Sequence, residues 1–373
     1  MQQIFYGGWI FFLKVSLDLR CGKKIGFKQT LMMLHFDSDY MRGAHPAVMQ
    51  RLMETNLEQT AGYGTDCHTE NAKRLIMKAC GLTGGEVYFL AGGTQTNATV
   101  IDGLLSRHEG VLAAGTAHIN VHEAGAVEAT GHKVMILPSH EGKLKADDVS
   151  RYISDFYRDE TYGHMVAPGM VYISHPTELG TLYTLDELES LSCACRESHI
   201  PLYMDGARLG YGLAAYSTDV TLKDIARLCD VFYIGGTKVG ALFGEAVVVT
   251  RTGLLPHFLP LVKQHGALLA KGRLLGVQFE TLFSEDLYLR ISRNAIDKAM
   301  KLKDGFLSKG YRPYIDSPTN QQFFWLPDEM IDRLMQTATF ELWGPRKGKE
   351  TPARFVTDWA TRDEEISELT ARL

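Results

Sequence analysis

The chain has 373 residues, of which 45% are hydrophobic and 22% charged. This composition is typical of a soluble globular protein with a sizeable core, and the length predicts two domains, because a domain usually holds about 100–200 residues. The net charge of −5 argues against nucleic acid or an acidic membrane surface as a partner. The six cysteines match no zinc-site spacing, so we expect free thiols, no metal site and a cytoplasmic protein.

The first 35 residues differ from the rest of the sequence. The apolar run "GGWIFFLKVSL" is interrupted by Lys14 and is too short to span a bilayer, which needs about 20 apolar residues. It lacks a preceding basic segment and a clear cleavage site, so a secretory signal is not expected. Residues 1–35 are therefore predicted to be an N-terminal extension. Three interpretations stay open: a targeting segment, an ordered arm, or a reading-frame extension upstream of a start near Met32 or Met33.

Residues 86–250 alternate between β-rich runs and helical stretches. Seven runs are candidate strands, and several are apolar almost throughout, which is typical of strands that helices cover on both faces. The candidate strands are 86–93, 110–115, 132–138, 169–175, 200–208, 230–238 and 245–250. The alternation predicts an α/β fold around a mostly parallel sheet of seven strands.

The segments between these runs carry helix signals. Thr184 lies three residues before Glu187, which predicts a capping box, and leucines follow at helical spacing. An amphipathic stretch over 69–81 ends at Gly81, a residue type that is common just after a helix.

The pattern changes after about residue 275. A long helical segment is predicted over 280–311, followed by short strands within 319–327, 339–344 and 353–360. We therefore expect a large domain with an N-terminal arm over 36–274 and a small C-terminal α+β domain over 275–373.

Two segments place anion-binding or charged groups at predicted strand ends. In "LAGGTQTNATVIDGLL" a strand leads into a helix, whose free N–H groups at Gly93, Thr94 and Gln95 could hold a phosphate; an ordinary strand–helix turn is the alternative. In "LYMDGARLGYGL" Asp205 ends an apolar strand, where ligands of α/β sheets bind; an internal pair with Arg208 is the alternative.

A third segment, "YIGGTKVGALFG", places Lys238 after another strand. It is either a surface lysine at a strand end or a Schiff-base lysine, whose amine becomes nucleophilic when burial and nearby positive charge lower its pKa. A phosphate-binding turn, an aspartate and a lysine at the strand ends of one sheet are together the parts of a pyridoxal 5'-phosphate (PLP) site. The aspartate keeps the pyridine nitrogen protonated, which makes the ring an electron sink.

The sequence resembles the β-eliminating lyase and threonine aldolase family, which has the aspartate-aminotransferase-like fold of PLP enzymes, fold type I. The resemblance covers roughly residues 36–373 and looks like one branch of the low-specificity L-threonine aldolases or closely related amino-acid lyases. It rests on the combination of "GAHP", "GYGTD", "GGTQTN", "AHINVHEAG", "YMDGARLGY", "YIGGTKVGALFGEA" and "RFVTDWA". The fold that it implies is a large PLP-binding domain followed by a small C-terminal domain.

The resemblance implies which residues bind the cofactor. Lys238 matches the lysine that forms the Schiff base, and Asp205 matches the partner of the pyridinium nitrogen. His118 matches a histidine that stacks on the pyridine ring, and Thr237 a hydroxyl residue beside the phosphate. The phosphate turn corresponds to Gly93, Thr94 and Gln95.

The resemblance also implies a set of substrate contacts. Arg354 matches an arginine that clamps the substrate carboxylate, and Arg208 one that binds this carboxylate or lies beside the ring. Ser38 falls in the N-terminal arm, where the family has a carboxylate contact. His164 and Glu178 flank the strand 169–175 and fall near groups that contact the β-hydroxyl.

Two further positions imply an oligomer. Tyr63 matches a tyrosine that often reaches the site of a neighbouring subunit, and Lys271 a basic residue near the phosphate across the dimer. We therefore expect a homodimer or homotetramer with active sites at the interface.

The implied reaction is a retro-aldol cleavage of the Cα–Cβ bond of a β-hydroxy amino acid, which converts threonine to glycine and acetaldehyde. The base is His164 or a water held by Glu178. The alternatives are a β-eliminating lyase acting on another amino acid and a catalytically silent relative that serves as a binding or regulatory protein. The chain departs from the better-known threonine aldolases in "GGTK" and in Met41-Arg42, so the substrate and its stereochemistry stay open.

Overall fold

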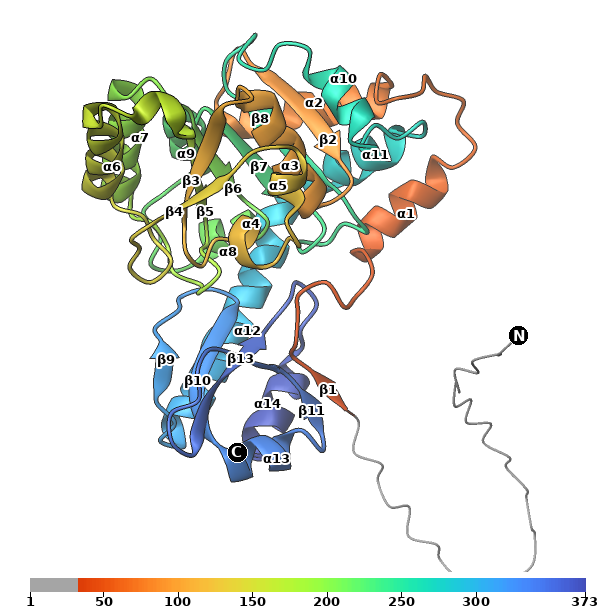
Figure 1. The fold of residues 1–373 in the computed structure, drawn as a ribbon. Helices are drawn as coiled ribbons and strands as arrows, with labels where there is room; N and C mark the ends of the chain where they lie inside the picture. Colours follow the sequence, from red (N-terminus) through yellow and green to blue (C-terminus); the bar gives the residue numbers. More distant parts are fainter. Residues whose placement is uncertain (1–32) are drawn as a thin grey trace, which may run out of the picture. The chain divides into compact units, whose positions relative to one another are not determined.

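A seven-stranded sheet forms the centre of residues 33–373, the part of the chain that the computed structural model describes (Figure 1). The strand order is β2-β8-β7-β6-β5-β3-β4, and β8 runs antiparallel to both of its neighbours, whereas β7, β6, β5, β3 and β4 are parallel. All seven candidate strands are confirmed. They are β2 (Glu86–Leu90), β3 (Glu109–Ala114), β4 (Val134–Leu137), β5 (Ala167–Ser174), β6 (Leu202–Asp205), β7 (Val231–Gly235) and β8 (Glu245–Val249).

Two groups of helices pack on this sheet. In one group α6 packs on α7, α7 on α9, α9 on α2 and α2 on α11; in the other, α3 contacts α5, α10 and β8. Strands β6, β7 and β8 are buried at every residue, as expected for a sheet that is covered on both faces. The helices are α1 (Pro46–Glu54), α2 (Cys67–Cys80), α3 (Gly93–Leu104), α4 (His118–Val121), α5 (Ala126–Ala129), α6 (Ala146–Arg158), α7 (Leu185–Glu197), α8 (Leu209–Ala214), α9 (Leu222–Leu228), α10 (Phe258–Gln264) and α11 (Arg273–Leu282).

Local sequence signals explain where two of these helices begin or end. At the start of α7 the hydroxyl of Thr184 accepts the N–H of Glu187, and the Glu187 carboxylate accepts the N–H of Thr184, which confirms the capping box. Helix α2 ends at Gly81, whose φ of 68° lies in the left-handed region that glycine adopts without strain.

A smaller sheet and three helices form the C-terminal part of the chain. The antiparallel strands run in the order β12-β13-β10-β9, and the two-residue strand β1 pairs in parallel with β11. Phe306 of helix α12 stacks on Phe324 of β10 with 4.4 Å between ring centroids, in a second apolar core. The elements are β1 (Leu34–His35), α12 (Leu287–Ser308), β9 (Pro313–Ile315), β10 (Gln321–Pro327), α13 (Asp328–Leu334), β11 (Ala338–Thr339), β12 (Glu341–Leu342), β13 (Glu350–Val356) and α14 (Asp363–Ala371).

Two predicted domain boundaries fall at secondary-structure elements of the structure. A domain boundary after residue 274 would divide α11, which packs on α1 and α2 of the large domain. The 22-residue helix α12 contacts α8 of the large domain and β10 and α14 of the small one, so we propose that the change of domain falls within α12. Leu34 and His35, assigned to the extension, form β1 on the small domain.

The helical character predicted over 280–311 is confirmed, but it is divided between two helices. Helix α11 ends at Leu282 and α12 begins at Leu287, with Glu285 and Asp286 between them at φ values of 52° and 54°. Non-glycine residues rarely adopt positive φ, and the helical pattern of the sequence carries no signal for this turn. The interpretations of residues 1–32 concern a part of the chain outside the described residues. Within residues 33–373 no helix is both long and apolar enough to cross a membrane.

The strand register brings the predicted site residues to one edge of the large sheet. Ser174 at the end of β5 lies opposite Asp205 at the end of β6, and Gly235 at the end of β7 lies opposite Glu245 at the start of β8. Glu245 also lies opposite Leu90 at the end of β2. The carboxyl ends of the parallel strands therefore share this edge with the first residue of the antiparallel strand.

Candidate active site

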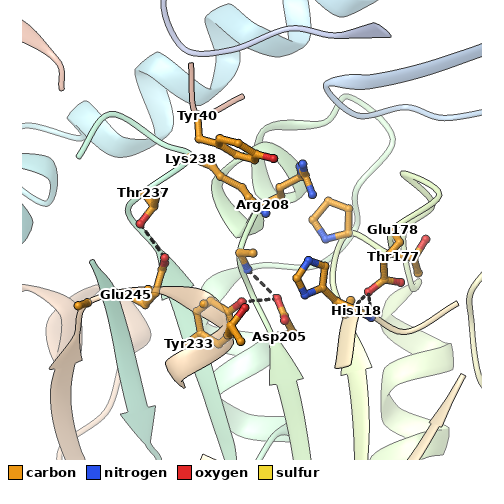
Figure 2. Close-up of a pocket in the computed structure, with 17 residues that line it drawn as sticks. Tyr40, His118, Thr177, Glu178, Asp205, Arg208, Tyr233, Thr237, Lys238 and Glu245 are labelled. Carbon is orange, nitrogen blue, oxygen red and sulfur yellow. Dashed lines mark hydrogen bonds between the residues drawn. The ribbon is translucent and has the colours of Figure 1, made fainter. Parts of the chain in front are cut away.

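A cavity of about 300 Å³ lies at this edge of the sheet (Figure 2). Lys238, Asp205, His118 and Thr237 line it, although they come from three separate segments. The first residues of α3 line it as well, so the lysine, the aspartate and the glycine turn that the sequence singled out lie in one site.

Lys238 lies in the tight loop that follows β7. The loop approaches the neighbouring backbone so closely that a Cβ atom on Gly235 would lie 2.2 Å from the carbonyl oxygen of Ala207. The half-buried lysine is held from behind by Tyr211, whose hydroxyl donates to the Lys238 carbonyl at 2.5 Å. Burial, and then the positive charge of Arg208, lower the pKa of the Lys238 amine, which favours its neutral, nucleophilic form.

Asp205 is buried and receives four hydrogen bonds. Its Oδ1 accepts the Tyr233 hydroxyl at 2.6 Å and the Ala207 N–H at 2.9 Å, and its Oδ2 accepts the Tyr172 hydroxyl at 2.7 Å and the Asn97 amide at 2.9 Å. Burial alone raises the pKa of Asp205, but the charge of His118 and these hydrogen bonds outweigh it and leave the pKa lowered. Asp205 is thus held as a carboxylate.

The alternative in which Asp205 pairs with Arg208 is wrong. Arg208 instead forms a two-pronged ion pair with Asp39 of the N-terminal arm, with Nε–Oδ2 at 2.7 Å and Nη2–Oδ1 at 3.0 Å. Asn320 donates to the same Asp39 oxygen at 3.0 Å, which ties the arm to the small domain. Asp205 is therefore left free of any arginine and faces the cavity.

His118 is the first residue of α4, and its side chain points into the cavity, where two glutamates hold the residue in place. Its Nδ1 lies 2.7 Å from Oε1 of Glu123, and its backbone N–H donates to Glu178 at 3.0 Å. Glu123 is fully buried, and the side-chain amide of Asn97 donates to both Glu123 and Asp205. This amide therefore links Glu123, the partner of His118, to Asp205. Among the described residues, Oε2 of Glu123 has no hydrogen-bond partner.

The predicted phosphate turn is the start of α3. Gly93 and Thr94 line the cavity, and no side chain caps the helix at Gly92, so its first N–H groups stay available for an anion. The side chain of Gln95 lies elsewhere, donating to the carbonyl oxygen of His265 at 2.9 Å. Its Oε1 accepts the N–H of Ala91 at 3.4 Å, so the Gln95 side chain braces the turn but does not line the cavity.

A second cavity of about 260 Å³ adjoins the first. Arg354 of β13 lies on its wall, with its guanidinium 4.7 Å from the ring centroid of Trp343, and forms an ion pair with Glu341. His122 lines this cavity between His118 and Trp343, with ring centroids at 5.6 Å and 6.0 Å. The two cavities share Tyr40, His118, Glu178, Arg208 and Lys238.

Two other predicted substrate residues lie at or near these cavities. Glu178 lines both, and its Oε1 accepts the Ser174 hydroxyl at 2.6 Å in addition to the His118 N–H. Burial raises the pKa of Glu178. Ser38 is buried in the arm, where its hydroxyl accepts the N–H of Tyr40 at 3.3 Å, but it lines neither cavity.

The structure does not bring His164 to the site. It lies exposed in the short helix η1 (Tyr162–His164), ahead of the first residue of β5, whereas the cavity lies beyond the last. An eight-residue strand spans roughly 26 Å, so His164 is removed from the catalytic candidates in its own chain. The sequence places both His164 and Glu178 beside the same strand but says nothing about which end each reaches.

Tyr63 and Lys271 also lie outside both cavities. They are exposed on adjacent loops, joined by a hydrogen bond of 3.0 Å from the Tyr63 N–H to the Ala270 carbonyl. Lys263 stands over the Tyr63 ring at 4.3 Å from its centroid. These two loops could therefore contact an active site only in a second copy of the chain.

Sequence reasoning missed several residues of the site. Asp39, Glu123, Glu245 and Glu341 are acids that hold or face the predicted groups, and Tyr40 lines both cavities. Glu123 and Glu245 stand in motifs that we singled out, "AHINVHEAG" and "GALFGEA", where a charged residue beside an apolar run was the available signal. For the other residues no such signal is present.

Comparison with known proteins defines the family. The model of the β-eliminating lyase family matches residues 35–313, and the chain belongs to this family. The low-specificity L-threonine aldolase of Pseudomonas aeruginosa is 29% identical over 343 residues, covering 90% of this chain and 95% of that protein. The solved threonine aldolase of Leishmania major is 41% identical with a TM-score of 0.88, covering 91% and 98% of the two chains. Thermus thermophilus aspartate aminotransferase, at 12% identity and a TM-score of 0.69 over 92% and 91% of the two chains, shares the fold.

Proposed function

We propose that this protein is a PLP-dependent lyase that cleaves the Cα–Cβ bond of β-hydroxy amino acids and converts threonine to glycine and acetaldehyde. The observation that carries the proposal is one cavity lined by Lys238, Asp205 and the uncapped start of α3, next to a second cavity that Arg354 lines. The resemblance to threonine aldolases over 90% or more of the chain supports the same reaction.

The residues of the first cavity fit PLP by their chemistry. The amine of Lys238 suits the aldehyde, the carboxylate of Asp205 the pyridinium nitrogen, and the N–H groups at the start of α3 the phosphate. His118 would lie against the ring. When bound, PLP supplies an electron sink for the electron pair of the bond that breaks at Cα.

The second cavity provides for the amino-acid part of the substrate. Arg354 and Arg208 both line it, and a guanidinium binds a carboxylate through two parallel hydrogen bonds. Arg354 is buried, and among the described residues its Nε has no hydrogen-bond partner. A substrate carboxylate would accept a hydrogen bond from this N–H group. Binding there would orient the Cα atom of the substrate towards Lys238.

Glu178 is the proposed base for the β-hydroxyl proton. It lines both cavities, and burial raises its pKa, which makes its carboxylate a stronger base. Both of its hydrogen bonds from Ser174 and His118 use Oε1, so we propose that Oε2 takes the proton.

We also propose a homo-oligomer in the cytoplasm. The exposed loops of Tyr63 and Lys271 would reach the cofactor site of a second copy. The described cysteines are free thiols, which is typical of a reducing compartment.

Spectroscopy and product analysis test the function. We expect the purified protein to be yellow, to be bleached by borohydride, and to release acetaldehyde from threonine. A Lys238→Ala variant should stay folded but lose more than the about 10²–10⁴-fold that a missing general base typically costs, whereas the exposed Lys309→Ala should match the wild type. A protein that never takes up PLP would refute the proposal, and release of ammonia and a keto acid in place of acetaldehyde would replace it with β-elimination.

A further inference from the structure

Glu245 is a buried acid at the phosphate end of the cavity that the proposed reaction does not use. It is 3% exposed and begins β8, between the ends of β2 and β7. It lines the cavity together with Gly93, Thr94 and Thr237, the residues expected to hold the phosphate. A buried acid beside an anion-binding turn requires an explanation, because two negative charges in a dry site repel each other.

The Glu245 carboxylate accepts hydrogen bonds from two groups that would otherwise be free to donate to a phosphate. Oε1 accepts the Thr237 hydroxyl at 2.8 Å, and Oε2 accepts the Gly236 N–H at 3.0 Å, as Figure 2 shows for Thr237. The sequence had assigned the Thr237 hydroxyl to the phosphate. In the structure that hydroxyl already donates to Glu245, so the acid must share or release it when phosphate arrives.

Two charged groups and three tyrosine hydroxyls surround Glu245. Lys238 lies on the loop after β7 and favours the carboxylate, whereas Asp205 at the end of β6 opposes it. The other titratable groups near it are the hydroxyls of Tyr203, Tyr233 and Tyr288. Burial dominates and raises the pKa of Glu245 to about 8, so the acid can change its protonation near neutral pH.

We propose that Glu245 serves as a neutral donor to the phosphate of the cofactor at this end of the cavity, and that in alkaline solution, where it is ionised before binding, it takes up a proton from solvent as the phosphate binds. The inference rests on the proposed function for the identity of the cofactor. A carboxylate can only accept hydrogen bonds, whereas the neutral acid keeps one accepting oxygen for Thr237 and offers an O–H to the anion.

The proposal predicts the sign of a pH dependence. The unliganded acid is ionised above about pH 8, so a proton must then be taken up for each phosphate bound, and affinity falls by up to tenfold per pH unit. Ionisation of the phosphate monoester of PLP does not interfere, because its second pKa is about 6. Inorganic phosphate still ionises near neutral pH, so its slope is read only above pH 8. Lys238 acts in the opposite direction, since its neutral amine becomes more abundant as pH rises.

A direct test measures binding of inorganic phosphate and of PLP to the cofactor-free protein between pH 7 and 9.5. Inorganic phosphate reports on this end of the cavity without chemistry at Lys238. Glu245→Gln is a neutral isostere that carries an N–H donor, and Glu178→Gln is the matched control, a buried acid of the same cavity on another loop. Calorimetry in two buffers of different ionisation enthalpy counts the protons taken up, and circular dichroism establishes that each variant folds.

We expect wild type and Glu178→Gln to lose about fivefold in affinity for inorganic phosphate from pH 8 to pH 9, while the proton uptake rises from about one half to about nine tenths. Glu245→Gln should lose less than twofold, with no proton uptake. Parallel profiles for wild type and Glu245→Gln, or no proton uptake, would overturn the inference. Binding of inorganic phosphate with these slopes but no binding of PLP would refute the proposed function and leave the role of Glu245 intact.

Discussion

Both arginines that we expect to bind the substrate carboxylate already hold a carboxylate of the chain. Arg208 pairs with buried Asp39, and Arg354 pairs with Glu341, whose side chain is 41% exposed. The two pairs differ in what they leave for a substrate. Asp39 also accepts a bond from Asn320 and is fixed in place, whereas Glu341 lies in the two-residue strand β12 at the edge of the small sheet.

Glu341 therefore competes with the substrate for Arg354. We expect Glu341→Gln to lower the KM for threonine by about two- to fivefold, because a partly exposed ion pair is worth roughly 0.5–1 kcal/mol. kcat should change little, since the variant leaves Lys238, Asp205 and Glu178 intact. Steady-state kinetics of acetaldehyde release measures both constants.

The matched control for this prediction is Glu350→Gln. Glu350 pairs with Arg312 at 2.6 Å, with a side chain 37% exposed, and it lies on β13 of the same sheet outside both cavities. An unchanged or raised KM in Glu341→Gln would show that Glu341 orients Arg354 for the substrate instead of competing with it.

At the residue scale, the sequence predicted the groups that end buried strands. Lys238 and Asp205 could be found because each follows an apolar run, and parallel strands place their carboxyl ends at one edge. Asp39 could not be found, because it meets Arg208 across 169 positions of the chain, and no local pattern encodes that contact. The position of His164 could not be found either, because adjacency in sequence to a strand does not say at which end of the strand a residue lies.

At the scale of elements, a buried histidine joins α2 to α11. His68 is 7% exposed, with Nε2 at 2.8 Å from Glu58 and Nδ1 at 2.7 Å from Glu280 of α11. Burial lowers the pKa of His68, but the hydrogen bonds and charges of the two glutamates outweigh it and raise the pKa above its usual value. The raised pKa favours the protonated form of His68, in which each ring nitrogen donates to one of the two glutamates.

This bridge makes stability depend on pH with a definite sign. The folded-state pKa is raised, so the stabilisation is fully present below the unfolded-state pKa of about 6.5 and is lost as pH rises through the folded-state pKa. We expect His68→Gln to cost on the order of 1–3 kcal/mol at pH 6 and less at pH 8.5. Urea unfolding at the two pH values measures the difference between the two costs.

Two variants control this experiment. Glu58→Gln removes one of the two acids and should retain part of the pH dependence, whereas His164→Gln replaces an exposed histidine and should leave it unchanged. An equal cost of His68→Gln at both pH values would mean that the histidine acts by packing alone.

The elements themselves were largely predictable, and the exceptions have physical causes. Buried parallel strands are marked by apolar runs, and Thr184 and Gly81 are local signals of helix ends. The break between α11 and α12 was missed because Glu285 and Asp286 adopt positive φ without a glycine. The domain boundary that we propose within α12 has no local signal in the sequence, because this continuous helix contacts elements of both domains.

At the scale of the whole molecule, the site of one chain is incomplete if the resemblance holds. Tyr63 and Lys271 lie on exposed adjoining loops, and neither lines either of the two active-site cavities of its own chain. Tyr63 also adopts a φ of 57°, a conformation that costs energy in a tyrosine and suggests that the loop is held for a purpose beyond its own packing. A second copy of the chain would give both side chains a role.

Subunit complementation tests this arrangement. Lys238→Ala disables the site of its own chain, whereas Tyr63→Ala would disable the site of the neighbour. In a mixed dimer one site then carries both substitutions and the other carries neither. After unfolding and refolding a 1:1 mixture of the two inactive variants, we expect about one quarter of wild-type activity to return, because half of the dimers are mixed and each has one intact site. Each variant refolded alone should stay inactive. If the mixture also stays inactive while sizing shows that mixed dimers form, Tyr63 serves the site of its own chain or no site at all.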